Sequence, residues 1–172
     1  TRPVEQAVDL IEKINDAGGQ ASSFPTLEIQ ASADSESIER CKFVSGYDWI
    51  IFVSQNAVRY SLSLLPIAAW PLRTCIASVG PTTSNALQQA GLQVSREQDN
   101  AMNSEALLIK FKDEQLTGKK ILIVRGNGGR ETLANGLREM GALVDYAEVY
   151  SRHCPDHDNE HLLQQLEDGI DI

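Results

Sequence analysis

Three polar turns carry the groups in this sequence that could hold an anionic ligand, and each lies between an apolar run and a helical pattern. The most distinctive is the stretch RGNGGR from Arg125 to Arg130, whose glycines leave backbone amides free beside two arginines. Amides at the start of a helix, with the positive end of its dipole behind them, suit a phosphate or a carboxylate. The candidate binding residues of the three turns are Ser54, Gln55, Asn56, Gly80, Thr82, Thr83, Arg125, Gly126 and Asn127.

The glycine turn by itself is a weak signal for a ligand. It lacks the GxGxxG spacing of a dinucleotide site and the Lys-Ser/Thr pair of a P-loop. A βα turn eased by glycine, with solvated arginines, remains an alternative, and the other two turns are also explained as helix caps. The case for binding therefore depends on all three turns meeting at one edge of a sheet.

Tyr150 is the candidate for proton transfer. The sequence contains no GxSxG, no HExxH and no cysteine with a suitable histidine and asparagine. Tyr150 ends an extended stretch, where a tyrosine commonly packs with its hydroxyl in water. In a cleft, the same hydroxyl could instead donate a proton or a hydrogen bond to a departing hydroxyl group. Both interpretations remain open from the residue alone.

Three histidines spaced by four residues raise the question of a metal site. They are His153, His157 and His161, with a cysteine and an aspartate among them. Histidine and cysteine are zinc ligands, but Pro155 interrupts any helix that would carry His153 together with the other two. We therefore predict a solvated acidic helix here and no metal site.

The composition limits the partners of the chain. At 172 residues with 42% hydrophobic content, the chain is long enough to bury a core. Its formal net charge of -9 argues against nonspecific nucleic-acid binding, which needs a basic face. The three cysteines form no CxxC pair, and no apolar run approaches the length of about 18 residues that spans a bilayer. Because no signal peptide is visible either, we predict a cytoplasmic protein that contacts neither nucleic acid nor membrane.

Alternating strand and helix patterns would position the three turns. Apolar runs predict strands over residues 49–53, 74–79, 92–95, 120–124 and 142–150, with helices between them. This alternation is typical of an α/β doubly wound parallel sheet of the flavodoxin-like kind. Right-handed crossovers then place the three turns at the carboxyl edge of the sheet, where open α/β sheets bind ligands. Ser54 and Ser104 are predicted to cap the helices that follow them.

The two ends of the chain predict parts of a second flavodoxin-like domain. A helical pattern over residues 4–14 and a short strand over residues 20–24 precede Pro25, and another helix closes at Gly169. We predict that residues 1–29 and 151–172 form domain 1 and that residues 30–150 form domain 2, inserted into it.

A two-stranded connector is expected between these domains. Residues 26–33 and residues 149–154 would run side by side as its two strands, with a cleft beside them. Because no strand precedes the first helix, and because residues 170–172 begin a strand that stops at once, we expect domain 1 to be incomplete in this chain. The chain would then be an internal portion of a longer protein.

Taken together, these residues resemble the uroporphyrinogen-III synthase family over essentially the whole chain. The individual motifs are modest, but their order and spacing are specific. They are Thr1-Arg2-Pro3, Phe24-Pro25, FVSQNAV over residues 52–58, VGPTT over residues 79–83, NSEAL over residues 103–107, RGNGGRE over residues 125–131, and Val149-Tyr150.

The resemblance implies a fold, a reaction and a set of site residues. The fold is two α/β domains joined by a two-stranded connector. The reaction is cofactor-free closure of hydroxymethylbilane to uroporphyrinogen III, with loss of water and inversion of the last pyrrole ring through a spiro intermediate. Tyr150 would assist departure of the hydroxyl group. Further substrate-binding residues implied by the resemblance are Thr83 in the cleft, the carboxylate holders Ser54, Gln55, Asn56 and Ser104, and Thr1 and Arg2 at the edge of the other domain.

The resemblance also bears on partners. It implies a monomer whose partner is the small-molecule substrate, and it leaves open a transient contact with the preceding enzyme of the pathway. A different class of function stays open as well: a flavodoxin-like module that binds a phosphorylated or nucleotide ligand at the glycine turn without catalysis.

Overall fold

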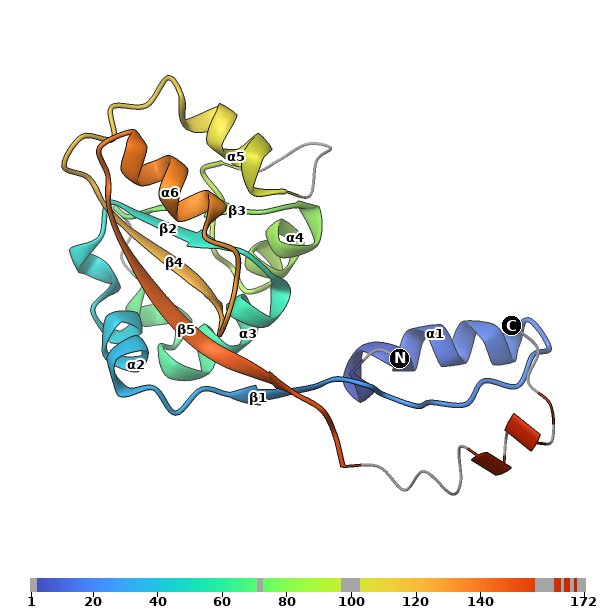
Figure 1. The fold of residues 1–172 in the computed structure, drawn as a ribbon. Coiled ribbons are helices and arrows are strands. Elements are labelled where there is room, and N and C mark those ends of the chain that lie inside the picture. Colours follow the sequence, from blue (N-terminus) through green and yellow to red (C-terminus); the bar gives the residue numbers. More distant parts are fainter. Residues whose placement is uncertain are drawn as a thin grey trace. The chain divides into compact units, whose positions relative to one another are not determined.

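The chain divides into two compact units in the computed structural model (Figure 1), which describes residues 3–70, 73–96, 103–156, 163–164, 166–167 and 169. One unit comprises Ala31–Ser151, and the other comprises Thr1–Gln30 together with Arg152–Ile172. Thr1, Arg2, His157 and His161 lie outside the described residues.

The described chain forms one five-stranded, mostly parallel sheet with strand order β1-β5-β4-β2-β3. Its strands are β1 (Glu28–Ala31), β2 (Trp49–Phe52), β3 (Cys75–Ser78), β4 (Lys120–Gly126) and β5 (Leu143–His153). Strand β2 pairs in parallel with both β3 and β4, and β4 pairs in parallel with β5. The prediction of an α/β fold built on a parallel sheet is therefore confirmed.

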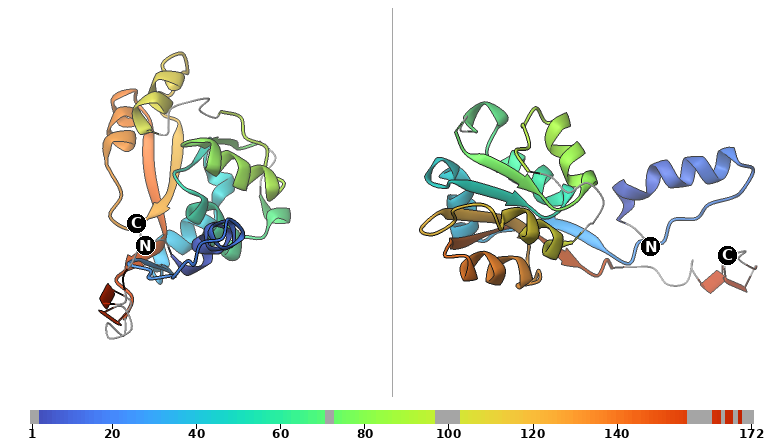
Figure 2. Two further views of the ribbon diagram at one scale, coloured as in Figure 1. Left: turned by 90° about the vertical axis from the view of Figure 1, so that its right-hand side faces the viewer. Right: turned by 90° about the horizontal axis from the view of Figure 1, so that it is seen from above.

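Helices cover both faces of the sheet in the larger unit. They are α2 (Ser35–Lys42), α3 (Gln55–Leu64), α4 (Pro81–Gln89), α5 (Ser104–Phe111) and α6 (Thr132–Glu139), with short 3-10 turns at Val44–Gly46 and Ile67–Ala69. Helices α5 and α6 pack together on one face, and α2, α3 and α4 pack on the other (Figure 2). The result is a three-layer α/β arrangement.

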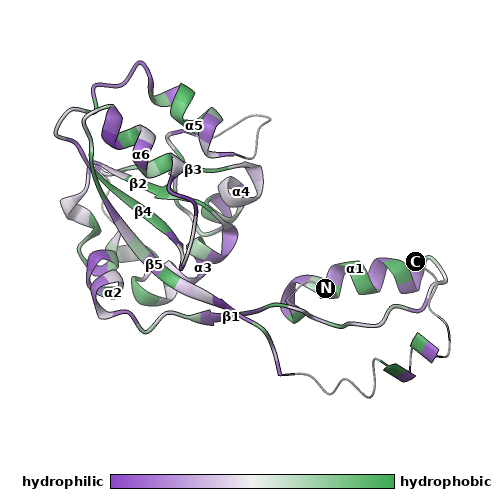
Figure 3. Cartoon of the chain, viewed as in Figure 1, coloured by the Kyte–Doolittle hydropathy of each residue, from purple (hydrophilic) through white to green (hydrophobic). Residues whose placement is uncertain are grey.

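Both faces of β2 and β4 are buried, as expected for strands between two helical layers. Trp49, Ile51 and Ile123 belong to the core cluster that includes Leu107 and Phe111 of α5. Because side chains alternate along a strand, the neighbouring residues face the other layer, where they are also buried. Figure 3 shows these two strands as the apolar centre of the unit.

The smaller unit contains α1 (Val4–Asp16), which confirms the helix predicted from its periodic apolar residues. Much of that apolar stripe is exposed, including Val4, Val8, Leu10 and Ile14. Gly18 follows the helix with φ of 87°, a left-handed conformation that favours glycine at a helix end.

Two short predicted strands are wrong. Residues 20–24 form no strand, and residues 92–95 form none either, although Arg96 makes a single bridge to Ala77. Both segments are short, and neither makes enough consecutive pairs to form a ladder. Strand β1 lies within residues 26–33, where one strand of the connector was predicted, and it neighbours β5 in the sheet.

Candidate functional site

The ends of three neighbouring strands bring the three polar turns to one edge of the sheet. Phe52 of β2 is in register with Val124 of β4 on one side and with Ser78 of β3 on the other. Each turn begins one to three residues later, and adjacent strands lie about 4.8 Å apart. The predicted meeting of the turns at the carboxyl edge is therefore confirmed by the strand register.

Tyr150 lies at the same edge, and its side chain is tightly packed. Strand β5 places it opposite Gly126, just after an irregularity in the β4 ladder. Its hydroxyl lies 3.0 Å from Ser54 Oγ, and its ring stacks on Tyr60 at a centroid distance of 5.9 Å. The side chain is only 1% exposed. The sequence left open a half-buried tyrosine with its hydroxyl in water, and the burial of Tyr150 excludes that alternative.

Position 126 has to be glycine for the Tyr150 ring to pack in this way, because the ring lies directly against it. A Cβ atom at position 126 would come within 2.4 Å of Tyr150 Cε2 and within 2.5 Å of Cζ. The backbone amide of the next residue, Asn127, donates to the Tyr150 carbonyl at 2.8 Å. The first glycine of the turn thus accommodates an aromatic ring.

Ser54 is both the cap of α3 and the partner of Tyr150. Its Oγ accepts a hydrogen bond from the amide of Ala57 at 3.1 Å, which confirms the predicted cap. Its backbone is extended, with φ of -161° and ψ of 160°, as an N-cap residue requires. The strand-to-helix junction after β2 therefore aims one serine hydroxyl at the phenol.

Arg125 is committed to partners within its own chain. It is 8% exposed, and its guanidinium lies 3.7 Å above the Tyr146 ring. Nε and Nη2 contact Glu148 at 3.0 and 2.9 Å, while Nη1 reaches Glu131 Oε1 at 2.9 Å. Nη1 also donates to the carbonyls of Gly129 and Arg130 at 3.2 and 3.4 Å.

Electrostatics favour the charged forms of these groups. Burial alone would lower the pKa of the Arg125 guanidinium, but its hydrogen bonds to Glu131 and Glu148 outweigh that effect and raise the pKa. Glu131 in turn accepts from the Tyr146 hydroxyl and from Arg125, which lowers the pKa of its carboxyl group. Arg125 therefore holds the RGNGGRE turn in shape.

The turn after β3 uses a glycine for a different reason. Gly80 precedes α4 with φ of 92° and ψ of 159°, a conformation that strongly favours glycine, and Pro81 begins the helix. Thr83 is 3% exposed and donates to the Val79 carbonyl at 3.3 Å. Ser84 contacts Ser78 at 2.6 Å, which ties the helix to the strand.

The chain is matched by the model of the uroporphyrinogen-III synthase HemD family over residues 8–172. The chain belongs to the uroporphyrinogen-III synthase family. It is 34% identical over 164 residues to the uroporphyrinogen-III synthase of Proteus mirabilis, covering 93% of this chain and 82% of that protein. It is 33% identical over 161 residues to the synthase of Salmonella typhimurium, covering 91% of this chain and 65% of that protein. The family resemblance drawn from the motifs is therefore confirmed.

Solved synthase structures share the fold. A mutant uroporphyrinogen III synthase from Thermus thermophilus superposes with a TM-score of 0.64 at 17% identity, over 94% of this chain and 64% of that chain. The synthase of Helicobacter pylori superposes with a TM-score of 0.55 at 17% identity, over 86% of this chain and 64% of that chain. The chain thus spans just under two thirds of the length of these solved synthases.

The other predicted residues lie at the same helix starts. Gln55 and Thr82 are exposed, and Asn56 is half-buried. Ser104 begins α5 but does not cap it, since the Asn103 side chain accepts from the amide of Ala106 at 3.0 Å. The predicted cap was thus wrong by one residue, because asparagine and serine are about equally good caps. Thr1 and Arg2 were also predicted to bind substrate and lie outside the described residues.

Sequence reasoning missed four side chains that build the site. Tyr60, Glu131, Tyr146 and Glu148 surround Tyr150 or Arg125. The strand period offered a signal for two of them, because Tyr146 and Glu148 lie on one face of β5, whereas the irregularity in the ladder turns Tyr150 to the opposite face. The contact between Tyr60 and Tyr150 joins a helix to a strand far away in the sequence, so no local pattern reveals it.

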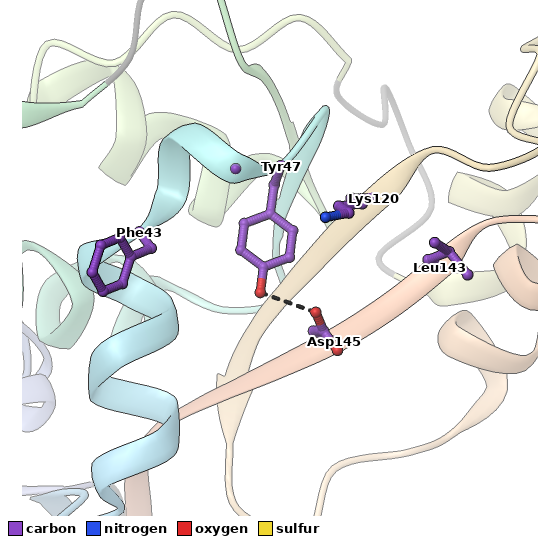
Figure 4. A pocket seen from close by; sticks show the side chains of 6 residues that line it. Phe43, Tyr47, Lys120, Leu143 and Asp145 are labelled. Carbon is purple, nitrogen blue, oxygen red and sulfur yellow. Dashed lines mark hydrogen bonds between the residues drawn. The ribbon is translucent and has the colours of Figure 1, made fainter.

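A depression elsewhere in the larger unit is lined by Phe43, Gly46, Tyr47, Lys120, Leu143 and Asp145 (Figure 4). Lys120 and Leu143 begin their strands, so it opens at the amino edge, away from the three turns. Tyr47 donates to Asp145 at 3.0 Å, and burial together with this bond raises the pKa of Tyr47 to about 12. Tyr47 therefore stays protonated and structural.

Among the described residues, no three His, Cys, Asp or Glu side chains gather closely enough to hold a metal ion. In that same part of the chain, none of the helices has the length and apolar content to cross a bilayer.

Proposed function

We propose that the complete protein converts hydroxymethylbilane to uroporphyrinogen III, with loss of water and inversion of the last pyrrole ring. The chain belongs to a family of hydro-lyases of porphyrin biosynthesis. The observation that supports this activity most directly is the hydroxyl pair of Tyr150 and Ser54, 3.0 Å apart at the carboxyl edge of the sheet. Such a pair can supply the proton that turns a departing hydroxyl group into water.

Substrate carboxylates would be held by backbone amides, side-chain amides and hydroxyls at the turns and helix starts along this edge. The proposed contacts are Ser54, Gln55, Asn56, Gly80, Thr82, Thr83, Ser104, Gly126 and Asn127, with Thr1 and Arg2 from the N-terminal segment. The free amides of a helix start and the positive end of its dipole favour negative charge without requiring basic side chains. Arg125, also predicted to bind substrate, contributes in this proposal by holding the glycine turn.

The wider organisation follows the family. We propose two flavodoxin-like domains, with residues 30–150 inserted between residues 1–29 and 151–172 of the other domain and a two-stranded connector joining them. We further propose a monomeric cytoplasmic protein that needs no cofactor. A transient contact with the enzyme that supplies the bilane is also compatible with this arrangement.

The test is a coupled assay with the complete protein. Freshly made hydroxymethylbilane should be converted to the type III isomer. Formation of only the symmetrical type I isomer would contradict the proposed activity, and binding of a nucleotide or flavin without turnover would favour a binding module instead.

A further inference from the structure

The Tyr150 hydroxyl is more deeply buried than the Ser54 hydroxyl beside it. Its side chain is 1% exposed, whereas Ser54, 3.0 Å away, is half-buried and lies at the start of α3. A substrate at the sheet edge would therefore meet the serine before the tyrosine. We propose that Ser54 delivers the proton to the departing hydroxyl group of the substrate and that Tyr150 resupplies it. This inference rests on the proposed function.

The hydrogen bonds of Ser54 leave one proton for the substrate. A serine hydroxyl has one donor and two acceptor positions. The amide of Ala57 occupies one acceptor position, at 3.1 Å. When the phenol donates to the second, the Ser54 proton is directed to neither of these partners. The cap bond to Ala57 therefore fixes the position of Ser54 Oγ. The Tyr150 phenol can replace the proton that Ser54 gives away, and the Ser54 O–H remains available to donate to the substrate.

The surroundings of Tyr150 favour a short transfer. Gly126 leaves no space for movement of the ring on one side, since any Cβ there would overlap it. Tyr60 stacks on the same ring at an interplanar angle of 28°. The positive end of the ten-residue helix α3 lies at Ser54 and favours negative charge developing on the phenol oxygen. Rigid placement of both oxygens is what general acid catalysis requires.

The step balances in protons and electrons. The Ser54 O–H bond breaks as its proton joins the hydroxyl oxygen of the substrate, while the Tyr150 O–H bond breaks as its proton moves to Ser54 Oγ. The carbon–oxygen bond then breaks, its electron pair leaves with water, and the pyrrole system carries the positive charge. Tyr150 is left as a phenolate. It regains a proton by way of Ser54 when the attacking pyrrole carbon loses its own on ring closure.

Variants of Ser54 test this assignment in the complete protein. Ser54→Gly removes the hydroxyl at a helix cap position, where glycine is tolerated almost as well as serine. We expect kcat to fall about 100-fold or more, as for loss of a general acid. KM for hydroxymethylbilane should be nearly unchanged, because the backbone amide of residue 54, which would hold a carboxylate, is kept. Ser54→Thr keeps both the cap and a transferable proton and should retain most of the turnover.

A double variant and a cap control complete the experiment. Because both hydroxyls serve one transfer, Ser54→Gly combined with Tyr150→Phe should be no slower than the slower single variant. Asp34→Ala removes the equivalent cap of α2, where Asp34 accepts from the amide of Ser37 at 2.9 Å. This variant should be less stable yet keep the wild-type kcat.

Four outcomes would overturn the assignment. An unchanged kcat in Ser54→Gly, with wild-type protein still making the type III isomer, removes Ser54 from the chemistry and leaves the proposed function intact. A raised KM at constant kcat would make Ser54 a carboxylate holder only. Additive losses in the double variant would separate the two hydroxyls. Wild-type protein that makes only the type I isomer would end both proposals.

Discussion

Tyr150 and Gly126 form the smallest unit on which the proposed chemistry depends. The glycine lies opposite the tyrosine in the ladder between β4 and β5, and the aromatic ring lies against its Cα. Packing of this kind leaves no room for an added methyl group. The orientation of the phenol toward Ser54 therefore depends on the first glycine of the turn.

Gly126→Ala should displace the Tyr150 ring. Its new Cβ would lie 2.4 Å from Cε2 of that ring, so the side chain or the strand has to shift. Overpacking of this kind typically costs about 1–3 kcal/mol of stability, and kcat should fall because the contact with Ser54 is lost. Denaturant unfolding and the bilane assay measure the two effects.

Gly46→Ala is the matched control for that change. A Cβ at position 46 meets nothing within 4 Å, and this glycine does not have a positive φ. Wild-type stability and turnover are expected for it. Wild-type turnover in Gly126→Ala as well would show that the position of the ring does not matter for the reaction.

An ion pair and a backbone hydrogen bond join the starts of β2 and β4. Asp48, just before β2, accepts from Lys119 Nζ at 2.8 Å and from the amide of Lys120, the first residue of β4, at 2.9 Å. The hydrogen bond from Lys119, followed by that from the Lys120 amide, lowers the pKa of the Asp48 carboxyl group. This pair aligns two central strands at the edge opposite the site.

The lowered pKa of Asp48 predicts a specific dependence on pH. Because the folded state favours the carboxylate, its stabilising contribution is complete above the unfolded pKa of about 3.9 and is lost as pH falls through the lower folded pKa. Asp48→Asn should therefore lose less stability than wild type on acidification from pH 5 to pH 3. Urea midpoints across that range measure it, and equal acid sensitivity of the two proteins would contradict this role.

Sequence patterns were sufficient for the elements that the core determines. The buried runs of β2 and β4, the cap at Ser54 and the shared edge of the three turns all follow from local residues and known chirality. They were insufficient where two neighbouring residues are almost equally good helix caps, as Asn103 and Ser104 are. They also failed where contacts are distant, so the role of Gly126 was visible only after β5 placed an aromatic ring against it.

For the whole molecule, charge restricts how a polyanionic substrate can bind. The net charge of -9 opposes long-range attraction of an anion. In the proposed mode, helix-start amides rather than many basic side chains hold the carboxylates, and Arg125 is already engaged by Glu131 and Glu148. Affinity must therefore come from short-range contacts.

Substrate affinity should accordingly weaken only modestly as salt is raised. Measuring KM for hydroxymethylbilane between 50 and 200 mM salt, on the order of the range over which basic polyanion-binding proteins lose much of their affinity, tests this point. A steep loss of affinity like that of such proteins would show that basic side chains do the binding.

In the proposed reaction, the hydroxyls at the carboxyl edge of the sheet direct closure of the bilane. The most direct measurement is the isomer composition of the product from freshly made hydroxymethylbilane, with complete wild-type protein compared with Tyr150→Phe at equal concentration. We predict that wild type yields the type III isomer, and that Tyr150→Phe shows a lower kcat, an almost unchanged KM and a larger share of the type I isomer. Wild-type turnover and isomer composition in Tyr150→Phe would contradict the claim.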